Sequence, residues 1–191
     1  MGLSNEGFRT FVFNPRGVGI PQITSNIFTF EGRLKDLDEC LKFVNKKYPN
    51  ANIYLTGFSL GGALAGRYFT ELKPLNKIKG FVSIGNPWDV YKAASSANHW
   101  TGFIYGQALT KNLAKKVEFN KESILKWCQL NNVKLDFNKI KNSNTTFEFD
   151  NHFSFKIVHD FKNSEEYYKK LSCLNLKNIN VPTLVIHSKE D

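Results

Sequence analysis

Short apolar runs alternate with segments of helical spacing in the first half of this chain, and one such run returns near its end. Runs rich in β-branched and aromatic residues predict four strands, at 9–14, 52–56, 80–84 and 182–187. Apolar residues at helical spacing predict helices over 31–48 and 60–72. Strands that alternate with helices predict an α/β fold, with a mainly parallel sheet and helices on both of its faces.

Residues 88–180 interrupt this alternation. The pattern there predicts helices over about 88–117, 121–131 and 164–171, and an Asn/Ser/Thr-rich loop at 142–146. Such a segment is too long for a simple crossover, and long excursions in α/β folds often form lids or substrate walls. We therefore expect one domain over 1–191 with a helical insertion at 88–180, whose aromatic residues form mainly the insertion's own core.

Composition narrows the class of protein. The 191 residues are 41% hydrophobic and 14% aromatic, as expected of a globular domain. The net charge of +9 comes mostly from scattered lysines, without the arginine and aromatic platforms of nucleic-acid binders. We expect no nucleic-acid partner, and leave open a weak contact with an anionic membrane surface.

Cys40, Cys128 and Cys173 are far apart and form no metal-ligand spacing. Reduced thiols in an intracellular protein are therefore expected, with no metal site. The sequence has no run of 18 apolar residues and no signal-peptide pattern at its N-terminus.

Gly57-Phe58-Ser59-Leu60-Gly61 follows an apolar strand and precedes a helix rich in small residues. This Gly-x-Ser-x-Gly pattern is typical of a nucleophile elbow, a sharp turn that exposes a serine hydroxyl above the sheet. Gly57 and Gly61 are expected where the strand and helix backbones come too close for side chains. The N–H of Leu60 is expected to stabilise an oxyanion. An ordinary strand-to-helix turn without chemistry is the alternative.

Motifs along nearly the whole chain resemble the α/β-hydrolase superfamily, and within it the YheT/EMB8 and ABHD1/2/3-like hydrolases. The matching motifs are Asn14-Pro15-Arg16-Gly17-Val18-Gly19, the elbow at 57–62, Thr145 to Asp150 with Phe153, Tyr167-Tyr168 and Ser172, and the strand 182–187 with Glu190-Asp191. Members of that group are carboxylesterases and acylglycerol or phospholipid lipases.

The resemblance implies roles for individual residues. Ser59 would be the nucleophile, and Asp191, rather than Glu190, the acid that orients a catalytic histidine. Asp150 would stabilise the fold, and Arg16 would hold its own turn by hydrogen bonds.

The sequence departs from the family pattern at the catalytic histidine, the third member of the Ser-Asp-His triad. This histidine would follow the acid by about 30 residues, whereas this sequence stops at Asp191. The chain contains His99, His152, His159 and His187, which are expected to be surface or structural residues. The early strands and the first oxyanion donor are missing too, so we expect a fragment of a longer protein or a gene prediction that lost both ends.

The expected function is cleavage of carboxylic esters, short-chain or lipid-like, through an acyl-enzyme on Ser59. The reaction needs no cofactor. A serine aminopeptidase-like peptidase and a degenerate hydrolase-fold binding module are the alternatives. The fragment itself is expected to be nearly inactive, and any membrane segment of a longer protein would lie upstream of Met1.

Overall fold

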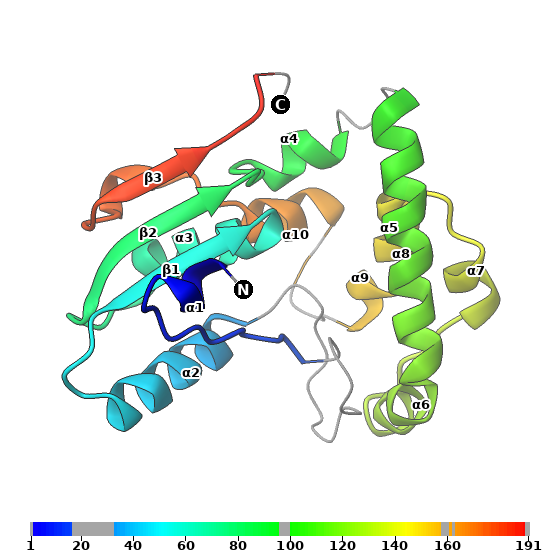
Figure 1. The fold of residues 1–191 in the computed structure, drawn as a ribbon. Helices are drawn as coiled ribbons and strands as arrows, with labels where there is room; N and C mark the ends of the chain where they lie inside the picture. Colours follow the sequence, from blue (N-terminus) through cyan, green and yellow to red (C-terminus); the bar gives the residue numbers. More distant parts are fainter. Residues whose placement is uncertain (1, 17–32, 96–99, 158–160, 162, 190–191) are drawn as a thin grey trace.

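The computed structural model describes residues 2–16, 33–95, 100–157, 161 and 163–189. Three parallel strands form one sheet in the order β1-β2-β3: β1 is Ile53–Phe58, β2 is Ile78–Ile84 and β3 is Thr183–Ile186 (Figure 1). Phe58 pairs with Ile84, and Ile84 pairs with Ile186. The carboxyl ends of all three strands therefore meet at one edge of the sheet, and the predicted α/β class is confirmed.

The predicted strand at 9–14 is wrong, because these residues form extended coil. The segment is held by aromatic contacts, and among the described residues its backbone pairs with no strand. The Phe11 ring lies 5.7 Å from the Tyr48 ring, and the Arg9 guanidinium lies 4.4 Å above Tyr48. A run with strand propensity forms a strand only where a neighbour pairs with its backbone groups.

Two helices pack on the sheet before the insertion. α2 spans Leu34–Lys47 and buries Leu37 and Leu41. α3 spans Leu60–Glu71 and is buried over most of its length, from Gly62 to Phe69. Their apolar side chains join Ile78 and Phe81 of β2 in the core under the sheet. A four-residue helix, α1 at Gly2–Asn5, precedes the coil at 9–14.

Between β2 and β3 the described chain is helical, as expected, with more elements than the sequence pattern predicts. The helices are α4 (Val90–Ser95), α5 (Trp100–Phe119), α6 (Lys121–Leu130), α7 (Phe137–Lys141), α8 (Thr146–His152), α9 (Ser154–Ile157) and α10 (Ser164–Leu171), and a 3-10 turn covers Leu176–Asn178. The short helices α7, α8 and α9 were not predicted. Asp136 caps α7 and Thr145 caps α8 through their side chains, and polar caps of this kind resemble loop residues in a sequence.

The insertion has a hydrophobic core of its own, as predicted. α5 to α9 stand beside the sheet (Figure 1) and bury the cluster Val117, Ile124, Trp127, Cys128, Ile140, Phe149, Phe153 and Ile157. A smaller cluster joins Tyr167 and Tyr168 of α10 to Ala63 of α3 and Val90 of α4. Through this cluster the insertion contacts the helix that follows the elbow.

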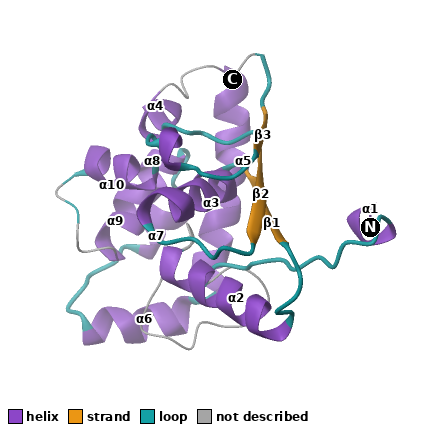
Figure 2. Cartoon of the chain, turned by 90° about the vertical axis from the view of Figure 1, so that its left-hand side faces the viewer, coloured by secondary structure: helices purple, strands orange, loops and turns teal. Residues whose placement is uncertain are grey.

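Helices cover one face of the sheet in the described part of the chain. Figure 2 shows α2, α3 and α10 on one side of the strands and only α1 with the N-terminal segment on the other. Tyr54, Phe58, Leu184 and Ile186 are accordingly exposed by 48–66%. Among the described residues the predicted flanking helices therefore lie mainly on one face, and the four-residue α1 is on the other.

Candidate functional site

Ser59 lies in the turn between β1 and α3, where the sequence placed it. Its backbone has φ 48° and ψ −130°, a left-handed conformation that costs free energy in a residue with a Cβ. Two hydrogen bonds hold the turn: Ser59 N–H donates to the Ile84 carbonyl at 2.9 Å, and Gly62 N–H donates to the Ser59 carbonyl at 2.8 Å. The serine is solvent-exposed. A strained serine at this point is the geometry expected of a nucleophile elbow.

Glycines make the tight turn possible, but the pair differs from the one expected. A Cβ on Gly57 would lie 2.5 Å from the Gly61 carbonyl oxygen, and one on Gly62 would lie 2.8 Å from the Asn86 Cβ. A Cβ on Gly61 would meet no described atom within 4 Å. The close approach of β1, α3 and the loop after β2 therefore depends on Gly57 and Gly62. Gly61, which was expected to share this role, does not contribute to it.

Leu60 is the first residue of α3, so its N–H belongs to the open amino end of a helix. No acceptor for this N–H is found among the residues that the structure describes. The aligned peptide dipoles of α3 add partial positive charge at this end. An oxygen anion forming above Ser59 would be stabilised by both effects.

The predicted acid cannot be placed, because Glu190 and Asp191 lie outside the described residues. The preceding strand can be placed. Ile186 pairs with Ile84, which pairs with Phe58, so β3 ends at the same edge as the elbow, with β2 between them. Ligands of open α/β sheets bind at this edge. The role of Asp191 stays a prediction.

The described histidines do not pair with Ser59. His187 Nε2 donates to the carbonyl of Asn86 at 2.7 Å, which joins the end of β3 to the loop after β2. His152 ends α8, in the insertion. His99 and His159 lie outside the described residues. The Ser59 side chain has no hydrogen-bond partner in the described parts of the chain.

Two buried polar residues beneath the elbow were missed by the sequence reasoning. Ser83 and Asn86 are fully buried, and their side-chain polar atoms have no partner among the described residues. Both lie against Gly62, where its missing side chain leaves room. The signal in the sequence is a serine inside an apolar strand, two residues before Gly85. Buried polar groups without partners cost stability, and they cluster at functional sites in folded proteins.

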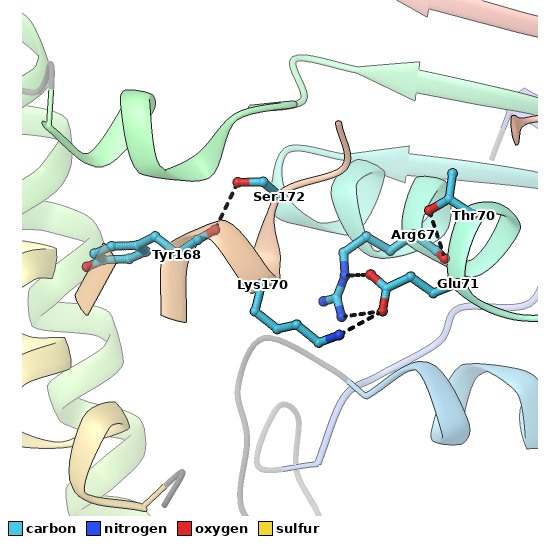
Figure 3. Close-up of polar contacts among 6 residues, drawn as sticks. All are labelled: Arg67, Thr70, Glu71, Tyr168, Lys170 and Ser172. Carbon is cyan, nitrogen blue, oxygen red and sulfur yellow. Dashed lines mark hydrogen bonds and ion pairs between the residues drawn. The ribbon is translucent and has the colours of Figure 1, made fainter. Parts of the chain in front are cut away.

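Polar contacts also fix α3 against α10. Figure 3 shows Arg67 of α3 bonded to Glu71, at 2.6 Å from Nε, while Lys170 of α10 bonds the same carboxylate at 3.2 Å. Arg67 is buried. Burial raises the pKa of Glu71, but hydrogen bonds and charge from Arg67 and Lys170 outweigh this and lower it below its ordinary value. α3 is therefore clamped to α10 at the end remote from Ser59.

Ser172 and Asp150 secure the insertion. Ser172 Oγ accepts from Val90 N–H at 2.9 Å. It donates to the Tyr168 carbonyl at 2.8 Å (Figure 3). Asp150 accepts from Ser154 and from the Tyr168 hydroxyl, both at 2.6 Å. The motif at 145–172 thus holds α4, α8 and α10 together, consistent with a structural role for Asp150.

Arg16 contacts α2 through its side chain. Its guanidinium donates two hydrogen bonds to Asp36, at 2.6 and 2.9 Å, in the first turn of that helix. This pair joins Arg16 to α2, whereas the turn that Arg16 was expected to hold lies from Gly17 onward outside the described residues.

Among the residues that the structure describes, no three His, Cys, Asp or Glu side chains lie close enough together to hold a metal ion. The three cysteines are free thiols. None of the described helices has the length and apolar character needed to cross a membrane.

Comparison with known proteins adds the family. The sequence-family model of the alpha/beta hydrolase fold matches residues 2–191 of this chain. A monoacylglycerol lipase of Saccharomyces cerevisiae is 29% identical over 187 residues, 96% of this chain and 41% of the lipase. Phospholipase ABHD3 of Homo sapiens is 24% identical, over 99% of this chain and 45% of its own length. The embryogenesis-associated protein EMB8 of Picea glauca is 26% identical, over 97% of this chain and 40% of its own length.

This chain therefore spans less than half the length of these relatives. No solved structure matches it. The family match covers the sheet, the elbow and the insertion alike, and the relatives are those that the motifs implied. The chain belongs to the alpha/beta hydrolase fold family.

Proposed function

We propose that this protein is a serine hydrolase that cleaves carboxylic esters through an acyl-enzyme on Ser59. The observation that supports this most strongly is the left-handed backbone of Ser59, at φ 48°, between a strand end and a helix start. Strained backbone of this kind, in a residue with a Cβ, is found mainly at active sites and ligand-binding positions. In an ordinary connection, glycine would serve without strain.

In this proposal the Ser59 oxygen attacks the ester carbonyl and forms a tetrahedral intermediate. The N–H of Leu60 stabilises the new oxyanion, the alcohol leaves, and an acyl-enzyme remains until water hydrolyses it. A histidine takes the Ser59 proton and gives it to the leaving alcohol, and Asp191 orients that histidine. We propose that this histidine lies outside the described residues, since His187 donates to Asn86 instead.

We propose esters of lipid-like acyl chains as the substrate class. The support is the set of relatives, whose names include a monoacylglycerol lipase and a phospholipase. We also propose an intracellular location, because three free thiols are typical of a reducing compartment.

The test is hydrolysis of p-nitrophenyl butyrate by the purified 191-residue protein, with Ser59→Ala as the control. We expect a very low rate that Ser59→Ala removes, because loss of a triad member leaves only weak residual catalysis. A rate unchanged by Ser59→Ala would refute the proposal. Faster cleavage of aminoacyl p-nitroanilides than of the ester would favour the peptidase alternative. No Ser59-dependent reaction with any of these substrates would favour the binding module.

A further inference from the structure

A shallow groove of about 300 Å³ lies between α5 and α7, in the insertion. Its apolar floor is formed by Ala114 and Phe137, with Val117 and Ile140, each 1% exposed, behind them. Phe137 and Ala114 are only partly buried, at the margin of the insertion core. Apolar side chains are therefore accessible from solvent along this side of α5.

The rim of the groove carries three exposed lysines: Lys111 and Lys115 of α5, and Lys141 at the end of α7. Within the described residues, none of the three has an acidic partner. Glu118 also lines the groove, but its carboxylate is paired with Lys121 at 3.0 Å. The groove therefore presents uncompensated positive charge above an apolar floor.

The side of α5 at the groove continues this pattern. Lys111, Lys115 and Phe119 are spaced four residues apart, so they follow one stripe along the helix. Phe119 is 57% exposed at the end of this stripe. Where a helix lies in a membrane interface, lysines contact the anionic headgroups, and apolar residues such as phenylalanine enter the boundary with the acyl chains.

We propose that this groove docks the protein on an anionic phospholipid surface. Lipid phosphates lie between Lys111, Lys115 and Lys141, and the upper acyl or glycerol carbons contact the apolar floor beside Phe119. The proposal does not depend on the chemistry of Ser59, because it concerns a surface of the insertion. Binding to a membrane and cleavage of an ester can therefore fail or succeed separately.

The experiment measures co-sedimentation of the 191-residue protein with vesicles of phosphatidylcholine, with and without roughly 30% phosphatidylserine. The test variant is Lys111→Gln with Lys115→Gln and Lys141→Gln. The matched control is Lys73→Gln with Lys79→Gln and Lys177→Gln, which removes three exposed lysines from around the start of β2 and from the 3-10 turn. Both variants have the same net charge, and circular dichroism checks that both are folded.

We expect the groove variant to lose binding to anionic vesicles by up to about 100-fold, at about fivefold for each lysine near the surface. The control should lose much less, and Phe119→Ala should weaken binding at constant charge. Equal losses in the two triple variants would overturn the proposal, since diffuse charge alone would then explain binding. Equal binding of the wild-type protein to vesicles with and without phosphatidylserine would also overturn it. The same would follow if the wild-type protein bound a nucleic-acid duplex as tightly as the vesicles and the groove variant lost that binding.

Discussion

The amide of Ser59 donates to the carbonyl of Ile84 at 2.9 Å, so the pairing of β1 with β2 continues one residue beyond the last residue of β1. This bond fixes the backbone at the point where Ser59 takes its left-handed conformation. The turn can therefore hold a strained residue, because both sides of it are hydrogen-bonded. The position of the serine is therefore fixed by the pairing of β1 with β2 on one side and by the first turn of α3 on the other.

Alanine substitutions at three glycines of the elbow should separate close packing from helix propensity. Gly57→Ala should unfold the turn or cost at least about 2 kcal/mol, because its Cβ would overlap backbone atoms of Gly61 and Gly62. Gly62→Ala should cost about 1–3 kcal/mol, since the side chain of Asn86 must move. Gly61→Ala should be neutral or stabilising by up to about 1 kcal/mol, because its Cβ meets open space on a helix.

Urea unfolding of the three variants measures these differences. A Gly61→Ala variant as unstable as Gly57→Ala would contradict this description of the elbow.

Two buried serines form a matched pair for a second prediction. Ser172 makes two hydrogen bonds, so Ser172→Ala should destabilise the protein by about 1–3 kcal/mol and leave Val90 N–H without its acceptor. Ser83 has no partner among the described residues, so Ser83→Ala should be neutral or slightly stabilising. Thermal unfolding of both variants tests this, and a larger loss for Ser83→Ala would show that its hydroxyl has a partner.

The clamp on α3 predicts a pH dependence. The pKa of Glu71 is lowered in the folded protein, so its contribution to stability is present above its unfolded pKa and is lost as pH falls through the folded value. Glu71→Gln should therefore destabilise the protein at about pH 7, by about 1–3 kcal/mol, because Arg67 stays buried with a weaker partner. The difference from wild type should shrink toward about pH 3.

Urea unfolding of both proteins across this pH range provides the measurement. Glu39→Gln is the control, because Glu39 is an exposed carboxylate. A Glu71→Gln deficit that stays constant down to the lowest pH would contradict the account.

A thiol in place of the Ser59 hydroxyl would report the electrostatics of the elbow without need of a histidine. Ser59→Cys should have a thiol pKa below the ordinary value of about 8.5, because the amino end of α3 stabilises the thiolate. Burial raises the pKa of Cys40, Cys128 and Cys173, so these thiols should react slowly. The rate of iodoacetamide alkylation against pH gives the value. An unshifted or raised pKa would argue against an oxyanion site here.

Much of the fold could be predicted from periodicity and turn residues. The three strands of the sheet and the helices α2, α3 and α10 lie close to their expected ranges, because apolar spacing dictates which faces they bury. The prediction of a strand at 9–14 was wrong, because a strand forms only beside a neighbouring strand, and the local sequence does not specify that neighbour. The helices α7 and α8 were missed because their capping residues, Asp136 and Thr145, resemble loop residues.

The site was predicted in part. Gly-x-Ser-x-Gly determined the place of Ser59, since few other turns join a strand to a helix so tightly. The contacts of Asn86 with Gly62 and with His187 could not be predicted, because they join three segments that are distant in sequence. The glycine that packs closely, Gly62 rather than Gly61, follows from the direction in which each Cβ would point.

The most direct test of Ser59 as a nucleophile is the detection of its acyl-enzyme. The 191-residue protein is incubated with excess p-nitrophenyl butyrate, quenched in acid and digested, and its peptides are examined by mass spectrometry. We predict one butyryl group on the peptide that contains Ser59, at low yield, and none on the other serines. The Ser59→Ala variant should remain unlabelled, and Ser188→Ala should label like wild type. Butyryl groups spread over surface lysines and serines, with Ser59 unmodified, would contradict the proposal.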